Sequence, residues 1–321
     1  MTGGREDRHM AARPLIAMDV GQTSTKAILC DSAGERREVL DGVQTDQPVL
    51  PQLRSLVAQT LADLGQDAVV ALGVSGLTGP DSQAEHLLDP PGTLRPLEIH
   101  LAHDSVTAGL SALGRSRGAV MAAGTGAVAL GVGQRSVARV DGWGNVMGDA
   151  GSAYWIGRSA LDAVMRAHDG RGPQTTFTAA AVRRWPDIES AYLQLQNDAD
   201  RVSTVAAFAR EVSRHADTDP VCAEICRRAG RELAHTVLTA LRRVGEPRGG
   251  EPTLVASTGG VFGSSHVREE FSAHLHRSLP QVRLLDSEAE GVDGAAHMAQ
   301  LPEDHPLRPL ISSAAPKECL R

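Results

Sequence analysis

Short apolar runs dominate the start of the chain, and glycines or polar turns separate them. "PLIAMDVG" at 14–21 and "TSTKAILC" at 23–30 each predict a strand, with a glycine turn between them, and a third strand is expected at 36–44. Residues 68–76, "AVVALGVSG", form a continuous apolar run, which is typical of a strand covered on both faces. Another strand is predicted at 97–104, so strands dominate this part of the chain.

Helical spacing follows in three places. One helix is predicted from apolar residues that recur every three or four positions, namely Leu50, Leu53, Val57, Leu61 and Leu64. A second is expected over roughly 105–113. A third and longer helix is expected over about 220–243, where Asp219 and Pro220 are a suitable N-cap and first residue. A strand is predicted after it, at 253–257.

The strand–turn–strand pattern of the N-terminus occurs a second time. "GAVMAAGTGAVALGVG" at 118–133 again has two apolar strands around a glycine turn, so that Gly21 and Gly124 mark corresponding positions. A chain of 321 residues is too long for one ordinary core and predicts two domains of about 150 residues each. The repeated pattern fits a duplicated domain.

Composition narrows the classes of partner. Apolar residues make up 41% of the chain and charged residues 22%, as in ordinary globular proteins. Aromatic residues are only 3% and the net charge is -7, which argues against a surface for nucleic acid or for an anionic membrane. No apolar run reaches the roughly 18 residues of a membrane span. The first fourteen residues lack the apolar part of a secretory signal and predict a disordered leader, so the default location is cytoplasmic.

The four cysteines do not predict a metal site. Cys30 lies in a predicted strand, and Cys222 and Cys226 lie one helical turn apart without further Cys or His residues nearby to complete a ligand set. Helix packing is the expected role of that pair. The fourth, Cys319, lies in a polar and proline-rich segment that begins after Leu301, for which a loose tail or a short closing element is expected.

The segment "MDVGQTSTKAILCD" at 18–31 combines an acid, a glycine and three hydroxyls. It matches neither the P-loop motif nor the dinucleotide motif, because its glycine turn leads into a strand and not into a helix. Backbone N–H groups at a hairpin tip can still hold phosphate, with hydroxyls of Thr23, Ser24 and Thr25 nearby, and Asp19 could hold Mg²⁺ through water. Taken alone, such a segment is more often a plain β-turn than a phosphate site.

Three glycine segments considered together change this balance. "DVGQTSTK", "AAGTGAV" and "STGGVFGSS" resemble the nucleotide-binding segments of the actin, sugar kinase and Hsp70 superfamily. A fourth segment, "GWGNVMGDAGSAYWIGRSAL" at 142–161, resembles a run found in N-acetylglucosamine kinases and the BadF/BadG/BcrA/BcrD ATPase family, and it is the most specific signal in the chain. The resemblance covers roughly residues 14–300. It implies an α/β fold with two actin/ribonuclease H-like domains facing across an ATP cleft.

The resemblance also implies roles for single residues. Asp104 corresponds to the catalytic base of these kinases, and Asp19 to the acid associated with the metal. ATP contacts are expected from two phosphate hairpins and an adenosine segment, that is from Gly21, Gln22, Thr23, Thr25, Gly124, Thr125, Gly126, Gly259 and Gly260. Sugar contacts are expected from Ser75, Gly76, Asp104, Trp143 and Asp149.

On this basis the first domain spans 1–117, with the first hairpin and the base, and the second spans 118–295, with the second hairpin and the adenosine segment. Residues 296–321 are then a tail that could return to the first domain. The implied cofactors are ATP and Mg²⁺, and the implied reaction is phosphoryl transfer to a hydroxyl, at C6, of N-acetylglucosamine or a related hexosamine. The expected partners are this small-molecule sugar and, in a homodimer, a second copy of the chain.

Several candidates have structural alternatives. Asp104 precedes a predicted helix and could serve as its N-cap, and Asp149 could cap a helix beginning near Ser152. His100 and His103 flank Asp104, and a structural role is the stronger expectation for both. Other such alternatives are an outward-facing Lys26 and a core position for Trp143.

The chain also departs from the family pattern. The usual "GDEGS" is "GDAGS" here, with Ala150 in place of an acid, while Ala127 and Val128 replace polar residues beside the second hairpin. The asparagine that helps to hold the sugar has no clear counterpart; Thr45 and Asp46 occupy that region. Two other function classes therefore stay open. One is an ATP-driven activator of a dehydratase or reductase, which needs cysteines for an iron–sulfur cluster. The other is a non-catalytic nucleotide or sugar sensor.

Overall fold

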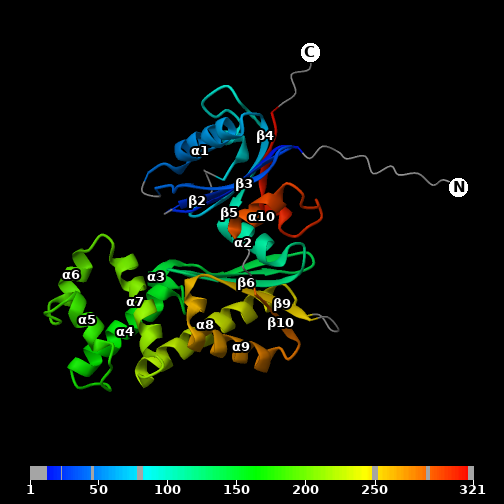
Figure 1. Cartoon of the computed structure of the whole chain (residues 1–321). Coiled ribbons are helices and arrows are strands. Elements are labelled where there is room, and N and C mark those ends of the chain that lie inside the picture. The colour runs from blue at the N-terminus through cyan, green and yellow to red at the C-terminus, as the bar shows by residue number, and fades with distance from the viewer. Residues whose placement is uncertain are drawn as a thin grey trace, which may run out of the picture. The chain divides into compact units, whose positions relative to one another are not determined.

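The computed structural model describes residues 13–22, 24–44, 47–77, 82–247, 252–286 and 290–316. Two compact units make up the chain: unit 1 contains residues 1–115 and 289–321, and unit 2 contains residues 116–288 (Figure 1). The predicted boundary at 295 differs from this division. It falls within helix α10 (Gly291–Met298), which packs on strand β1 and helix α2 of unit 1.

Unit 1 is built on a mixed sheet with the strand order β11-β5-β4-β1-β2-β3. β1 pairs antiparallel with β2 and parallel with β4, and β4 pairs parallel with β5. The strands are β1 (Leu15–Val20), β2 (Ser24–Asp31), β3 (Gly34–Asp41), β4 (Ala68–Val74), β5 (Pro96–His103) and β11 (Ser312–Ala314). The predicted strands and helices of this region are all present, with ends shifted by a few residues.

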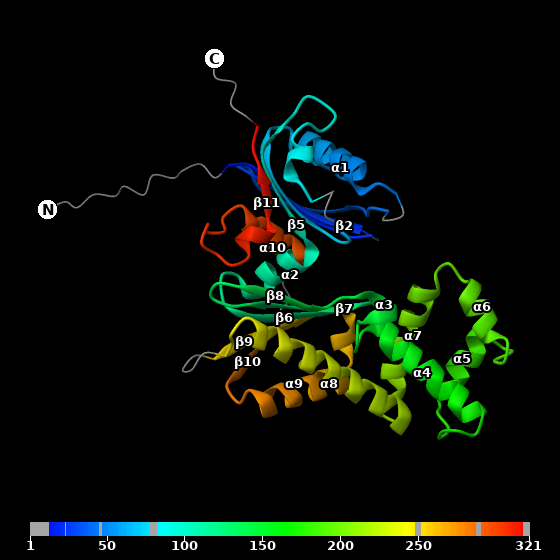
Figure 2. The same cartoon turned by 180° about the vertical axis from the view of Figure 1, so that it is seen from behind.

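Helices cover both faces of the unit 1 sheet (Figure 2). Helix α1 (Val49–Leu64) packs its predicted apolar stripe against alternate residues of β4, such as Val70 and Leu72, which are fully buried. The opposite face of β4 meets helix α2 (Asp104–Leu113), because successive side chains of a strand point to opposite sides. The approach there is close, since a Cβ atom at Gly73 would lie 2.4 Å from the hydroxyl of Thr107. β4 is therefore apolar on both faces, as its sequence predicts.

The last described strand, β11, forms one edge of the unit 1 sheet. β11 pairs antiparallel with β5, with Ser313 opposite His100. The Ser313 hydroxyl lies 2.9 Å from Nδ1 of His100, whose ring is buried. His100 thus has the structural role that was expected for it.

Unit 2 repeats this strand arrangement in the order β10-β9-β6-β7-β8. β6 pairs antiparallel with β7 and parallel with β9, as β1 does with β2 and β4. The strands are β6 (Gly118–Ala123), β7 (Ala127–Val132), β8 (Val137–Asp141), β9 (Thr253–Thr258) and β10 (Val282–Asp286). The duplication that the sequence suggests is thus present in the topology of the two sheets.

Helices α8 (Pro220–Arg243) and α9 (Ser265–Ser278) pack together, and α8 covers strands β6, β7 and β8. The N-cap predicted for α8 is confirmed, because the Asp219 carboxylate accepts hydrogen bonds from the backbone N–H groups of Val221 and Cys222. Among its described residues, unit 2 also contains the α-helices α3 (Gly144–Met147), α4 (Ala153–His168), α5 (Thr178–Arg184), α6 (Ala191–Asn197) and α7 (Arg201–His215) and the 3-10 helix η3 (Gly260–Gly263). Helices α4 to α7 form a separate helical part of this unit (Figure 1).

Cys222 and Cys226 lie inside the core of unit 2, where both side chains are almost fully buried. Burial in apolar surroundings raises the pKa of the Cys222 thiol to about 12 and also raises that of Cys226. Helix packing is confirmed as their role, because neutral buried thiols behave as small apolar side chains.

Candidate functional site

The first glycine hairpin joins β1 to β2. Its turn closes with a hydrogen bond of 3.1 Å from the Gly21 N–H to the Ser24 carbonyl oxygen, and Gln22 at the tip is exposed. Thr23 lies outside the described residues. The prediction that Thr25 contacts phosphate is corrected by the structure. Its side chain is fully buried, and its hydroxyl donates a hydrogen bond to the Asp41 carbonyl oxygen at 3.1 Å. Thr25 faces the core because side chains alternate along the strand.

Asp19, Ser75 and Asp104 come together at one edge of the unit 1 sheet. Asp19 lies near the end of β1, Ser75 directly follows β4 and Asp104 directly follows β5, and these three strands are parallel to one another. The carboxyl ends of parallel strands meet at the same edge, where α/β proteins generally bind their ligands. Gly76 lies beside them and has a φ of 72°, a backbone conformation that favours glycine.

The carboxylate of Asp19 is held in an electrostatically unfavourable place. Burial and the negative charges of Asp104 and Glu290 raise its pKa to about 6, although the positive charge of Lys26 acts in the opposite direction. Lys26 lies on β2 with a side chain that is 43% exposed, in agreement with the outward direction expected for it, and it pairs with Glu290 at 2.5 Å. A Cβ atom at Gly291 would lie within 2.8 Å of both Asp19 carboxylate oxygens, so only glycine lets the start of α10 approach this acid so closely.

Asp104 is the first residue of α2, and His103 occupies the N-cap position, with its Nδ1 3.2 Å from the Ser105 nitrogen. Nδ1 accepts from that N–H only in the tautomer in which it does not donate to Asp104. The alternative of Asp104 as N-cap is therefore wrong. Burial by itself raises the pKa of Asp104, but hydrogen bonds from His103 and Ser75 outweigh it, and the net pKa lies below its ordinary value. The distance from His103 Nδ1 to Asp104 Oδ1 is 2.7 Å. Asp104 is thus an ionised, oriented and half-buried carboxylate, as a general base requires.

The second glycine hairpin joins β6 to β7 and lies against the start of α4. The Gly124 N–H donates to the Gly126 carbonyl oxygen at 2.9 Å. The first two N–H groups of α4, those of Ala153 and Tyr154, donate to the carbonyl oxygens of Gly124 and Thr125 at 2.8 and 3.3 Å. These bonds satisfy N–H groups that have no partner within a helix. They fix the hairpin while leaving Gly124 and Thr125 exposed.

A pocket of about 470 Å³ lies beside this hairpin within unit 2. Its walls come from the hairpin, from α4, α7 and α8, and from the segment after β9. The lining residues include Gly124, Thr125, Ala153, Ala206, Arg210 and Gly260. Gly259, the other predicted adenosine residue, precedes this wall with a φ of 102°, and a Cβ atom there would lie 2.3 Å from the Ala123 carbonyl oxygen. The second hairpin and the predicted adenosine segment therefore border one pocket of nucleotide size.

Asp149 lies under the second hairpin, and Asp141 positions it. The Asp149 side chain is only 7% exposed and accepts a hydrogen bond from the Gly144 N–H at 3.3 Å. A Cβ atom at Gly126 would lie 2.7 Å from its carboxylate. Burial and the neighbouring charge of Asp141 raise the pKa of Asp149, and N–H groups of Gly144 and Ala127 partly offset this. These contacts give Asp149 a role in holding the hairpin, and its contact with sugar stays a prediction.

Two local alternatives are decided near this hairpin. The N-cap of α4 is Ser152, whose hydroxyl accepts from the Trp155 N–H at 3.2 Å, so Asp149 does not cap that helix. Trp143 is 64% exposed beside α3, with Val146 and Met147 also exposed. The alternative of Trp143 as a core residue is therefore wrong: its indole is exposed, and the Arg139 guanidinium lies 5.7 Å from the centroid of its ring.

Sequence reasoning missed Asp141, Glu290 and Gly291. Asp141 accepts hydrogen bonds from the N–H groups of Asp149 and Ala150 at 2.8 and 3.1 Å. Glu290 is the N-cap of α10 and forms a capping box with Asp293. A local sequence signal for such a box exists, because one acid stands three residues before another, ahead of an apolar run. This signal does not show that Asp19 lies near the box.

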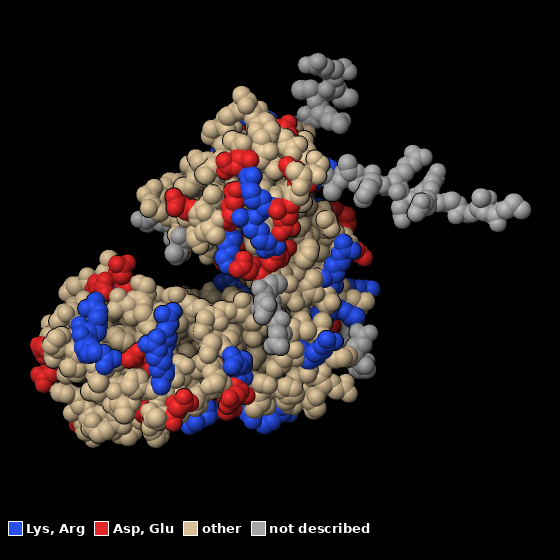
Figure 3. All heavy atoms as spheres, in the orientation of Figure 1, with Lys and Arg blue, Asp and Glu red and all other residues tan. Residues whose placement is uncertain are grey.

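Charges on the face of unit 1 seen in Figure 3 are interleaved: red and blue side chains alternate over it. The ion pairs of this region include Arg36 with Glu38 at 2.6 Å and Arg37 with Asp293 at 2.7 Å. Among the helices described here, none has the length and apolar character needed to cross a membrane.

Comparison with known proteins identifies the family. The model of the BadF/BadG/BcrA/BcrD ATPase family matches residues 16–299, and the chain belongs to this family. Its fold class, two sheets of related topology in a mixed α/β chain, is that of actin-like sugar kinases. The family resemblance stated from the four motifs is thereby confirmed.

The individual relatives share only 22–25% sequence identity with this chain. The chain is 25% identical over 275 residues to an N-acetylmuramic acid/N-acetylglucosamine kinase of Clostridium acetobutylicum, with 80% of this chain and 86% of that protein covered. It is 23% identical to an N-acetyl-D-glucosamine kinase of Dictyostelium discoideum, with 90% and 98% covered. A solved structure from Chromobacterium violaceum, proposed to be an N-acetylglucosamine kinase, shares the fold with a TM-score of 0.68 and 22% identity, and covers 89% of this chain and 98% of its own.

Proposed function

We propose that this protein is an ATP-dependent amino-sugar kinase that phosphorylates a hydroxyl, at C6, of N-acetylglucosamine or a related hexosamine. The observation that carries the proposal is the position and charge state of Asp104. It lies at the sheet edge that also presents Asp19 and Ser75, and its lowered pKa keeps the carboxylate ionised at neutral pH. Both named relatives are kinases of N-acetylated amino sugars, in agreement with this choice of acceptor.

In the proposed reaction the Asp104 carboxylate takes the proton of the sugar hydroxyl. The hydroxyl oxygen then forms a bond to the γ-phosphorus of ATP, the bond to the β–γ bridging oxygen breaks, and ADP leaves. General-base assistance of this kind contributes about 10²–10⁴-fold to the rate. His103 positions the base, because its Nδ1 lies 2.7 Å from the Asp104 carboxylate.

Asp19 is the residue that would hold Mg²⁺. A half-buried carboxylate with a raised pKa, close to the negative charges of Asp104 and Glu290, gains from a divalent cation. The residues therefore fit a magnesium ion that takes one or two carboxylates and completes its shell with water and phosphate oxygens. When bound, the ion neutralises charge on the phosphates.

Unit 2 supplies the proposed nucleotide pocket. The exposed tip of its hairpin, at Gly124 and Thr125, suits phosphate, and the small residues Ala206, Ala207 and Gly260 leave room for a flat adenosine. Asp149 and Trp143 are proposed to contact the sugar, since the first is close to the hairpin and the second is exposed.

An ATP-driven activator is the second candidate, favoured by the family itself. Such a protein needs cysteine ligands at a surface where a cluster can bridge two chains. Cys222 and Cys226 do not meet this need, because both thiols are buried in the core of unit 2. The kinase is therefore the better supported function.

The test is an ADP-release assay with glucosamine, N-acetylglucosamine, N-acetylmannosamine, N-acetylmuramic acid and glucose as acceptors. At least one amino sugar should support turnover that requires Mg²⁺. Absence of turnover with every amino sugar would remove the kinase assignment, and iron bound to the purified protein would favour the activator.

A further inference from the structure

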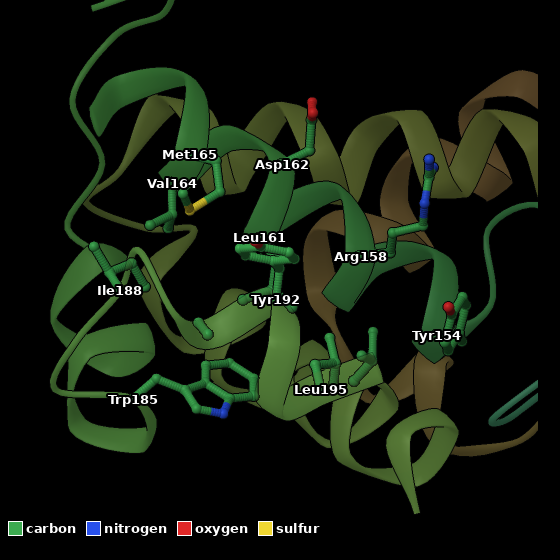
Figure 4. Close-up of a pocket in the computed structure, with 12 residues that line it drawn as sticks. Tyr154, Arg158, Leu161, Asp162, Val164, Met165, Trp185, Ile188, Tyr192 and Leu195 are labelled. Atoms are coloured by element: carbon green, nitrogen blue, oxygen red, sulfur yellow. The ribbon is translucent and has the colours of Figure 1, made fainter. Parts of the chain in front are cut away.

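A second cavity in unit 2 has no role in the proposed reaction. It has a volume of about 390 Å³ and lies in the helical part formed by α4 to α7 (Figure 4). Its lining is apolar or aromatic at most positions, with Leu161, Met165, Trp185, Ile188, Tyr192 and Leu195 among the lining residues. Of the lining residues, Val164, Trp185 and Val205 are almost fully buried. A cavity of this size and lining suits a small apolar or aromatic body.

The polar residues that line this cavity differ in whether they already have a hydrogen-bond or ion-pair partner. Asp162 is paired with Arg166 at 2.7 Å, so its charge is balanced. Arg158 lies one helical turn before Asp162 on α4, and both side chains project from the same side of that helix in Figure 4. Within the described parts of the chain, neither the Arg158 guanidinium nor the Tyr154 hydroxyl has a hydrogen-bond or ion-pair partner. The rim therefore has an uncompensated positive charge, which complements an anion.

This cavity and the nucleotide pocket border the same helix pair, α4 and α7. On α4, Tyr154 lines the cavity and Ala153 the nucleotide pocket; on α7, Val205 and Ala206 divide in the same way. The two helices touch closely, because a Cβ atom at Gly157 would lie 2.0 Å from the Val205 carbonyl oxygen. A shift of α4 relative to α7 would therefore also displace Gly124 and Thr125, because hydrogen bonds join the start of α4 to these two residues.

We propose that this cavity binds a small carboxylic acid with an aromatic or branched aliphatic body, and that its binding is coupled to nucleotide binding beside the second hairpin. The acid's carboxylate pairs with Arg158 and its apolar body lies among Leu161, Met165 and Tyr192. Only the coupling rests on the proposed function. By linkage, the acid and the nucleotide must change each other's affinity by the same factor.

Isothermal titration of the full chain with phenylacetate tests the site, with 2-phenylacetamide as the neutral probe of nearly equal shape. Phenylacetate should bind saturably, with one molecule per chain. Arg158→Gln should weaken phenylacetate by about tenfold, since it removes a charge-assisted hydrogen bond, and leave the affinity for the amide unchanged. Leu195→Trp, which fills the mouth, should abolish both. Arg171→Gln, at an exposed arginine outside the cavity, is the matched control and should change neither.

Coupling is measured as ADP affinity with and without saturating phenylacetate. A change of about threefold or more is expected, and it should vanish in Leu195→Trp. Absence of phenylacetate binding, or equal binding to Arg158→Gln and wild type, would overturn the site. A dimer that Leu195→Trp dissociates, without phenylacetate binding, would instead assign the cavity to a second copy of the chain. Equal ADP affinities would overturn the coupling. None of these measurements depends on turnover, so failure of the kinase assignment is seen separately.

Discussion

The two glycine hairpins occupy the same place in two sheets of the same topology, but different interactions support them. In each unit the first strand pairs antiparallel with the next strand and parallel with a later one. Asp19 lies two residues before Gly21, whereas the residue two before Gly124 is Ala122. The duplicated backbone is thus kept, while the acid is present in one copy only.

The surroundings follow the same division. The end of β1 in unit 1 is charged, with Asp19, Lys26, Asp104 and Glu290 acting on one another. The end of β6 in unit 2 is built from small residues, and neighbouring backbone approaches it at Gly259 and Ala153. The comparison supports the proposed function, in which the first hairpin region serves charged ligands and proton transfer and the second serves close backbone contact with a nucleotide. Three substitutions test this division.

The largest effect is expected from a substitution at the charged end of the unit 1 sheet, near the first hairpin. Asp104→Asn removes the proposed base but keeps the size of the side chain, so kcat should fall by about 10²–10⁴-fold while ATP affinity stays within a few-fold of wild type. Steady-state kinetics and a nucleotide titration measure the two. Asp89→Asn, at an acid of unit 1 with 82% exposure, is the control and should leave kcat unchanged. An Asp104→Asn protein with normal kcat would take the base role away from this residue.

A smaller effect is expected from a substitution in unit 2, where neighbouring backbone approaches the end of β6 near the second hairpin. Gly259 has φ 102° and ψ 160°, a conformation that essentially only glycine adopts, and its neighbour is the Ala123 backbone. Gly259→Ala should cost about 2–4 kcal/mol of unfolding free energy and weaken nucleotide binding, because strain and overlap both act on the end of β6.

Gly170→Ala is the matched control for this substitution. Gly170 also has a positive φ, 73°, but no atom lies within 4 Å of the added Cβ. Its cost should be about 1 kcal/mol, from backbone strain alone. Equal costs of the two substitutions, measured by urea unfolding, would show that close approach at Gly259 contributes nothing.

The smallest effect concerns the charge of Asp19. Its pKa is about 6 in the folded protein and near its ordinary value of 3.8 when unfolded, so the folded state holds more protons between these values. Ionisation therefore costs stability, and the cost grows as the pH rises from about 4 to about 6. Asp19→Asn should be more stable than wild type by roughly 1–2 kcal/mol at pH 7.5, with the gain lost near pH 4.

Urea unfolding of both proteins in Mg²⁺-free buffer at several pH values measures this difference. A gain that does not depend on pH would contradict the raised pKa. Addition of Mg²⁺ with ATP should stabilise wild type more than Asp19→Asn, because only the wild type has the carboxylate that is proposed to hold the ion.

Local sequence rules predicted the elements well because they depend on near neighbours. The apolar stripe of α1 and the N-cap of α8 are both found as predicted. The same rules failed for Thr25 and for the N-cap of α2. At Thr25 the strand's alternation, and not the hydroxyl, decides the direction of the side chain. At α2 the capping position belongs to His103, although the sequence offered the Asp104 carboxylate as an alternative for it.

The amino-acid order by itself determined the strands and helices, the repeated glycine turns and the family motifs, because periodicity and turn chemistry act over a few residues. The tertiary structure alone decided that Glu290 and Gly291 surround Asp19, which lies more than 250 positions earlier in the chain, and that the α4 amides hold the second hairpin. Such contacts arise from strand order and helix packing. The pKa of a carboxylate depends on which distant charges and apolar groups the fold brings beside it.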